Sequence, residues 1–164
     1  MDSPLWDVII VGAGPSGSSA AYKAAKTGQK VLLLDKAEFP RDKPCGGGLT
    51  PKTLQRLEFD VSPVVERACT RMVLTDNFTQ EAVLPEAGVV CSMVQRPAFD
   101  RLLRDKAVEA GAVFQVAEVE GIIQQRDGVL VNTHGGGYVP GSLVDCRGWG
   151  EKPVAPTAAP PPCG

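Results

Sequence analysis

Two short runs of apolar residues near the N-terminus have the pattern of strands that are buried on both faces. The first, residues 8–11, is wholly β-branched, and the second, residues 31–34, ends at Asp35. The segment between them, residues 16–26, is rich in Ala and Ser and is followed by Gly28, a residue typical of helix ends. This order predicts a strand–helix–strand unit with a right-handed parallel crossover.

A second helix and a third strand are predicted further along the chain. Apolar residues recur at helical spacing through residues 97–110, and residues 113–116 are then expected to form a third parallel strand. Residues 122–131, with a turn at Asp127-Gly128, indicate a β-hairpin.

The middle of the chain is less regular. Residues 36–48 read as a polar loop, a short helix is expected near residues 51–57, and residues 73–90 indicate short strands joined by turns. The whole pattern predicts an α/β fold. It is a Rossmann-like domain in which a parallel sheet of three or more strands carries an added antiparallel hairpin.

Composition and charge argue against several classes of function. The 164 residues carry a formal charge of −2 with acidic and basic residues interspersed, which provides no footprint for nucleic acid or an anionic membrane. No apolar stretch approaches the ~18 residues of a membrane span, and the first residues lack the features of a signal peptide. The five cysteines are scattered without a Cys-x-x-Cys pair, so neither a disulfide framework nor a metal site is expected. We therefore predict a cytoplasmic location.

A glycine-rich motif lies between the first strand and the first helix. Gly12 permits a tight turn, Gly14 lets the backbone approach a pyrophosphate, and Gly17 lets the helix sit close to the strand. Asp35, at the end of the second strand, can accept hydrogen bonds from both ribose hydroxyls of an adenosine. The alternative is a glycine-rich turn beside an exposed Asp with no ligand. The motif predicts dinucleotide binding but does not distinguish NAD from FAD.

Two further segments resemble a known family. Residues 40–49 (PRDKPCGGGL) and residues 95–103 (QRPAFDRLL) are similar to motifs of the geranylgeranyl reductase family, a branch of the aromatic-hydroxylase-like flavoproteins. The resemblance covers residues 5–140, with its motifs in the family's order. It implies FAD as cofactor and reduction of C=C bonds in a prenyl lipid or pigment. Flavin N5 would deliver the hydride, after its own reduction by NAD(P)H or ferredoxin. A peripheral membrane position is compatible with such a substrate in the intact parent.

The resemblance also implies which residues contact the cofactor. The triple glycine leaves bare backbone that a flat ring can approach closely, and Arg41 and Lys43 are cations suited to a phosphate, with a solvated charged loop as the alternative. With the dinucleotide motif, the predicted cofactor-binding residues are Gly12, Ala13, Gly14, Gly17, Asp35, Lys36, Arg41, Gly46, Gly47, Gly48 and Arg96.

Cys45 is the one candidate catalytic residue. A thiol beside the flavin can donate a proton to one alkene carbon as the other receives hydride. The alternative is a small residue that fits a tight turn. The choice depends on the pKa of the thiol, which the sequence does not give.

The resemblance ends near Gly141. The family continues into a buried strand that ends in an Asp-Gly motif, whereas this chain continues into residues 142–153 and a Pro- and Ala-rich segment, residues 151–164, for which we expect disorder. Some of the codons that can encode residues 145–153 would, if read one nucleotide later, encode a sequence like the missing motif. We therefore hypothesise a reading-frame shift, which sequencing the gene tests. The predicted domains are residues 1–141, an incomplete FAD/NAD(P)-binding domain, and residues 142–164, a divergent tail.

This departure has an expected physical consequence. The missing strand should lie beside the first strand, and its loss would expose that apolar strand as a sheet edge. We accordingly expect the chain alone to bind FAD weakly or not at all and to be inactive, although the parent is an enzyme. The alternatives to a reductase are a flavin monooxygenase that uses O₂ and a non-catalytic flavoprotein remnant.

Overall fold

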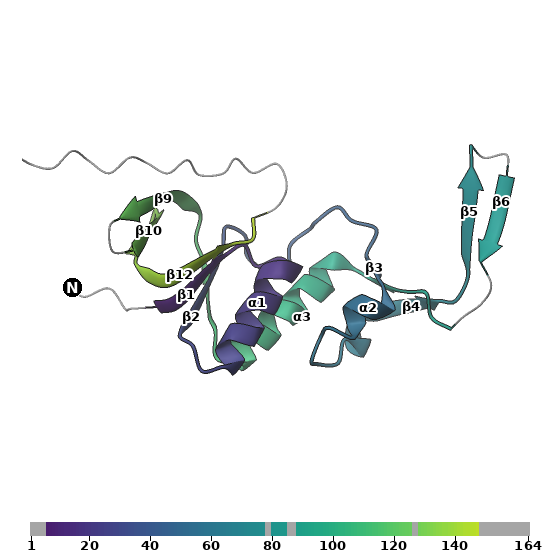
Figure 1. Ribbon diagram of the computed structural model, residues 1–164, viewed down its shortest axis with the longest axis horizontal. Helices are drawn as coiled ribbons and strands as arrows, with labels where there is room; N and C mark the ends of the chain where they lie inside the picture. Colours follow the sequence, from purple (N-terminus) through teal and green to yellow (C-terminus); the bar gives the residue numbers. More distant parts are fainter. Residues whose placement is uncertain (1–5, 78–79, 85–87, 126–127, 148–164) are drawn as a thin grey trace, which may run out of the picture. The chain divides into compact units, whose positions relative to one another are not determined.

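The computed structural model describes residues 6–77, 80–84, 88–125 and 128–147 (Figure 1). The chain divides into two compact units. The first holds the residues up to Phe39 and those from Leu103 onward, and the second holds Pro40–Leu102. One of the two boundaries, between Leu102 and Leu103, falls within a helix.

A four-stranded parallel sheet forms the centre of the first unit. Its strand order is β12-β1-β2-β8, and every neighbouring pair is parallel. The strands are β1 (Trp6–Val11), β2 (Val31–Asp35), β8 (Val113–Val116) and β12 (Pro140–Asp145). The predicted strand–helix–strand unit and the third parallel strand are confirmed, and with them the α/β fold class.

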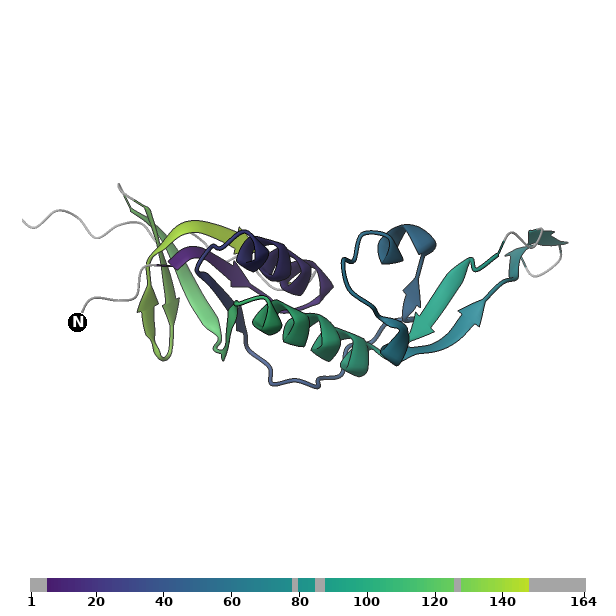
Figure 2. The same ribbon diagram turned by 90° about the horizontal axis from the view of Figure 1, so that it is seen from below.

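Both faces of this sheet are covered, which explains the uninterrupted apolar runs. On one face Val8 and Ile10 pack with small residues of α1 (Pro15–Lys26) and with Ala107 of α3 (Arg96–Glu109). On the other face Ile9 and Val11 pack against a three-stranded antiparallel sheet, which lies opposite α1 (Figures 1 and 2). Its strands are β9 (Val119–Gln125), β10 (Gly128–Thr133) and β11 (Gly136–Tyr138), so the predicted hairpin has gained a third strand. Asp127 of the predicted turn lies outside the described residues.

The strand β12 corrects one prediction. The edge of β1 that was expected to be exposed is paired with β12, with Ile9 opposite Leu143 and Ile10 opposite Val144. The prediction was wrong because the apolar pair at positions 143 and 144 can form a strand without the family's motif. The sheet therefore continues past the predicted domain boundary at residue 141. The predicted disorder at residues 151–164 falls outside the described residues.

The second unit is built from short antiparallel strands. Its three-stranded sheet has the order β3-β7-β4, and a two-stranded ribbon, β5 with β6, follows β4. The predicted helix near residues 51–57 is α2, shorter than expected and capped by the Thr50 hydroxyl, which accepts from the N–H of Thr53. The elements are β3 (Gly48–Leu49), α2 (Pro51–Leu54), the 3₁₀ helix η1 (Ser62–Val64), β4 (Val65–Cys69), β5 (Met72–Asp76), β6 (Gln80–Leu84) and β7 (Cys91–Val94).

Candidate functional site

The turn between β1 and α1 depends on two of its glycines. Gly12 has φ +97° and donates its N–H to the carbonyl of Leu34 at 2.7 Å, which joins the turn to β2. A Cβ at Gly17 would lie 1.8 Å from the carbonyl oxygen of Gly12, so only glycine lets the first turn of α1 pack here. The predicted packing role of Gly17 is therefore present in the structure.

A third segment closes over this turn. The chain leaving β12 donates the N–H of Cys146 to the carbonyl of Val11 at 2.7 Å. A Cβ at Gly12 would lie 2.7 Å from the carbonyl oxygen of Cys146. Burial and the nearby charge of Asp145 raise the pKa of the Cys146 thiol. This contact was not predicted from the sequence, because only two apolar residues, Leu143 and Val144, precede Asp145.

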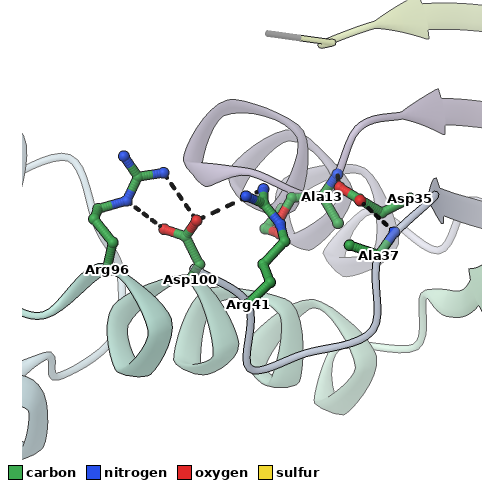
Figure 3. A network of polar contacts seen from close by, with 7 residues as sticks. Ala13, Asp35, Ala37, Arg41, Arg96 and Asp100 are labelled. Carbon is green, nitrogen blue, oxygen red and sulfur yellow. Dashed lines mark hydrogen bonds and ion pairs between the residues drawn. The ribbon is translucent and has the colours of Figure 1, made fainter. Parts of the chain in front are cut away.

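Asp35 links the ends of β1 and β2. Its carboxylate accepts from the N–H of Ala13 at 2.7 Å and from that of Ala37 at 3.0 Å, as Figure 3 shows. Gly14 is the N-cap of α1 and supplies no side-chain cap, so the first N–H groups of the helix have no side-chain acceptor at the cap. A carboxylate has about four lone-pair positions, so it can accept several hydrogen bonds at once. Lys36 follows in an exposed position.

The turn therefore fits the adenosine and diphosphate parts of a dinucleotide. Bare backbone, uncapped helix N–H groups and a carboxylate all occur at the carboxyl ends of parallel strands, which is where α/β sheets bind ligands. The residues whose positions suit a dinucleotide are Gly12, Gly14 and Asp35.

The glycine triplet in the second unit has two different roles. A Cβ at Gly47, which has φ +69°, would lie 2.1 Å from the carbonyl oxygen of Val94, and one at Gly48 would lie 2.8 Å from the sulfur of Cys91. Gly47 is thus required by the pairing of β3 with β7, whereas a side chain at Gly48 would need the Cys91 side chain to move. Gly46 has no atom within 4 Å of its would-be Cβ, so it is the member of the triplet with open space above its backbone.

Two arginines of the second unit contact one buried carboxylate. The Asp100 side chain is fully buried and accepts from Nε and Nη2 of Arg96, both at 2.8 Å. Nη2 of Arg41 lies 3.7 Å from the same carboxylate, and Figure 3 shows both guanidinium groups directed at Asp100. Asp100 was part of the family motif but was not predicted as the partner of Arg96, although its spacing of four residues from Arg96 on a predicted helix is the signal for such a pair.

Cys45 is exposed. The backbone N–H of Gly47 and then a hydrogen bond from Arg96 lower the pKa of the Cys45 thiol, while desolvation and the charge of Asp100 oppose the effect. The hydrogen bonds to Asp100 raise the pKa of Arg96 further above its already high value, so this guanidinium is always charged. A cation beside a thiol is the usual way in which a protein activates a cysteine.

The predicted residues thus fall into two groups. Gly12, Ala13, Gly14, Gly17 and Asp35 gather at the β1–α1 turn in the first unit. Arg41, Cys45, the glycine triplet and Arg96 belong to the second unit. That both groups hold one flavin stays a prediction.

Comparison with known proteins identifies the family. The sequence model described as "FAD dependent oxidoreductase" matches residues 7–122. The chain belongs to this family of FAD-dependent oxidoreductases. Relatives that are named as reductases support the resemblance of the sequence to the geranylgeranyl reductase family.

Two relatives are reductases. The chain is 40% identical over 111 residues to geranylgeranyl diphosphate reductase of Rhodobacter capsulatus, covering 65% of this chain and 27% of that protein. It is 40% identical over 113 residues to menaquinone reductase of Mycolicibacterium smegmatis, again covering 65% of this chain and 27% of the relative. The chain thus spans about a quarter of the length of these relatives.

A solved structure confirms the fold. The geranylgeranyl bacteriochlorophyll reductase-like protein of Thermoplasma acidophilum superposes with a TM-score of 0.75 at 23% identity, covering 88% of this chain and 39% of that one. Among the described residues, none of the helices is long and apolar enough to cross a membrane. Within the same residues, no three His, Cys, Asp or Glu side chains are grouped so as to hold a metal ion.

Proposed function

We propose that this chain provides the FAD-binding part of a reductase that saturates C=C bonds of a prenyl chain. The observation that carries the proposal is the contact between the Asp35 carboxylate and the N–H of Ala13, which holds this carboxylate beside the glycine turn of an FAD-dependent family. The substrate class follows from the relatives, because geranylgeranyl diphosphate and menaquinone both carry isoprenoid chains.

The first unit binds the adenosine diphosphate half of the cofactor in this proposal. The backbone N–H groups at the start of α1, beginning after Gly14, donate to the diphosphate, and the dipole of the helix favours its negative charge. Asp35 accepts from the ribose hydroxyls while it also holds the N–H of Ala13. Lys36 adds a positive charge at the exposed start of the following loop.

The resemblance to the geranylgeranyl reductase family implies the residues for the flavin ring and for the proton. Gly46 offers open backbone to a flat ring, and Arg41 and Arg96 supply positive charge. FAD, when bound and reduced, supplies a hydride to one alkene carbon, with NAD(P)H as the proposed source of the electrons. The Sγ atom of Cys45 holds the proton that the second carbon receives. The lowered pKa suits this role, because a general acid works best when its pKa is close to the working pH.

Titration of the whole chain tests the binding step. We expect FAD and ADP to compete for one site, with fluorescence of FAD as the readout, and FMN to compete poorly because it lacks the adenosine diphosphate half. Absence of binding by both FAD and ADP would contradict the proposal and would favour a non-catalytic remnant.

A second experiment tests the chemistry. The expected inactivity of the chain alone was based on an exposed edge of β1, and β12 closes that edge. The chain is therefore incubated with FAD, NAD(P)H and geranylgeranyl diphosphate without oxygen, and the product is analysed by mass spectrometry. The gain of two hydrogen atoms for each saturated C=C bond is the expected result. Oxygen-dependent hydroxylation of a substrate, with no saturated product, would instead indicate a monooxygenase.

A further inference from the structure

Two cysteines lie directly opposite each other in the three-stranded sheet of the second unit. The strands β4 and β7 are antiparallel, and Cys69 at the end of β4 is the partner of Cys91 at the start of β7. The N–H of Val90 also donates to the carbonyl of Cys69 at 2.8 Å, which holds the two strands together at this point. Both cysteines are half-buried and are free thiols in the structure. Directly opposite residues have their side chains on the same face of a sheet, so the two thiols are neighbours.

The spacing of such a pair permits a disulfide bond. Directly opposite residues of antiparallel strands have Cα atoms about 4.5 or about 5.5 Å apart, and a disulfide accepts about 4.4–6.8 Å. Their Cβ atoms are about 4.5–5.5 Å apart, whereas a disulfide brings the Cβ atoms to about 3.8 Å. The strands must therefore move slightly closer together. A disulfide that strains its surroundings in this way is more easily reduced, as is typical of reversible disulfides.

The sulfur atom of Cys91 lies in space that Gly48 leaves open. A Cβ at Gly48 would lie 2.8 Å from Sγ of Cys91, and the same Sγ lies 3.9 Å from Sδ of Met93. Rotation about χ1 of Cys91 moves Sγ to another staggered position. A bond to Cys69 would therefore take this sulfur atom away from Gly48, the last member of the glycine triplet.

We propose that Cys69 and Cys91 form a reversible disulfide, and that its formation withdraws the sulfur atom of Cys91 from Gly48. The oxidant is a small-molecule disulfide such as oxidised glutathione. The thiolate of one cysteine attacks its S–S bond and releases one molecule of reduced glutathione. The second cysteine attacks the mixed disulfide, forms the Cys69–Cys91 bond and releases the other. The protein loses two electrons and two thiol protons, and glutathione disulfide takes up both to become two thiols.

The experiment equilibrates the whole chain with a series of ratios of oxidised to reduced glutathione. Free thiols are then blocked with a maleimide, and the chain is digested with trypsin without reduction. Cleavage leaves Cys69 in residues 68–71 and Cys91 in residues 72–101, so the disulfide joins two peptides that mass spectrometry identifies. We expect this link to be the main disulfide of the folded chain, with loss of most maleimide labelling at both positions. Excess reduced glutathione should restore the labelling, and in urea, where the strands no longer hold the pair together, other cysteines should compete.

A matched pair of glycine variants tests the movement of the sulfur atom. In Gly48→Ala the added methyl group takes the space of Sγ of Cys91, which disfavours the free thiol form. We expect half of the chain to be linked at a share of oxidised glutathione about threefold lower or less than in the wild type. Gly46→Ala is the control and should leave this midpoint unchanged, because no atom lies within 4 Å of its would-be Cβ. Cys45→Ser should form the same link as the wild type.

Two results would overturn the proposal. One is that the folded wild-type chain forms no link between these peptides at any glutathione ratio, or links either cysteine to a different one in its place. The other is an unchanged midpoint in Gly48→Ala that circular dichroism shows to be folded. The first result needs no variant, so it decides the matter even if Gly48→Ala does not fold. Because these measurements contain neither FAD nor ADP, their failure is distinct from a failure of the titrations that test the proposed function.

Discussion

The carbonyl oxygen of Cys146 occupies the space that a side chain at Gly12 would need. The would-be Cβ lies 2.7 Å from that oxygen, and Gly12 also has φ +97°. The glycine of the dinucleotide motif therefore has a role in the sheet itself, since it admits the chain that leaves β12. This relationship makes the motif's first glycine a structural requirement even without a ligand.

Gly12→Ala should consequently lower the free energy of unfolding by more than backbone strain alone explains. A non-glycine residue at positive φ costs about 1–2 kcal/mol, and we expect displacement of the Cys146 segment to add about 1 kcal/mol or more. Urea unfolding followed by circular dichroism measures the loss. The matched control is Gly28→Ala, because Gly28 has φ +83° with no atom within 4 Å of its would-be Cβ. Equal losses in the two variants would show that the Cys146 contact is unimportant.

Asp35→Asn should weaken FAD and ADP binding about tenfold or more. An amide oxygen carries no charge and has fewer lone pairs, so it cannot hold the N–H groups of Ala13 and Ala37 and also accept from ribose. Asp7→Asn is the control, since Asp7 accepts from the N–H of Lys30 at 2.7 Å at the opposite end of the same strands. The control should leave both affinities unchanged. A similar loss in both variants would indicate a general effect on stability.

Gly46→Ala and Gly47→Ala should have very different effects on the free energy of unfolding. The first adds a methyl group in open space and should change the free energy of unfolding by less than about 0.5 kcal/mol. It should weaken FAD binding but leave ADP binding unchanged, since only FAD carries the ring. The second places a Cβ 2.1 Å from the Val94 carbonyl and should cost about 2–4 kcal/mol. Thermal unfolding and the two titrations check both expectations, and equal tolerance of both changes would contradict them.

The pair formed by Asp145 and Arg147 should make a small part of the stability depend on pH. Nε of Arg147 donates to Oδ1 of Asp145 at 2.9 Å, and the hydrogen bonds from this guanidinium lower the pKa of the carboxyl below its usual 3.8. A depressed pKa contributes stability that is present above about pH 4 and is lost as the pH falls through the folded-state value.

The test compares Asp145→Asn with the wild type across this pH range. The Asp145 side chain is 39% exposed, so we expect a loss of only about 0.5 kcal/mol near neutral pH, which disappears in acid. Arg147→Gln should give the same loss, and the double variant should add nothing further, as measured by urea unfolding midpoints. A difference that persists in acid would point to packing and exclude the ion pair as its cause.

The local sequence pattern was sufficient to predict most helices and strands of the first unit. The β-branched run at β1, the small residues of α1 and the apolar spacing of α3 each carry their own periodic signal, and all three occur where they were predicted. The strand β12 did not have such a signal. Only Leu143 and Val144 of this strand are apolar, and its pairing partner lies more than a hundred residues earlier in the chain. The sequence pattern therefore predicted that the strand beside β1 was missing.

The candidate site divides in the same way. The motif residues Gly12, Gly17 and Asp35 could be named because their chemistry depends on neighbours close in sequence or on a strand end. The packing roles of Gly47 and Gly48 could not, because the atoms that exclude a side chain there come from β7. Asp100 was read as part of a family motif, and its burial and its two arginine partners became visible only in the folded unit.

The sequence by itself determined the glycine-rich turn and the order of the main elements, because these depend on residue type and short-range periodicity. Its motifs carried the resemblance to the family. The tertiary structure decided which strand closes the edge of β1 and which glycines are needed for packing. It also decided which carboxylate holds Arg96. These are contacts between segments distant in the chain, and their energies depend on desolvation and close approach, which arise only when the segments meet.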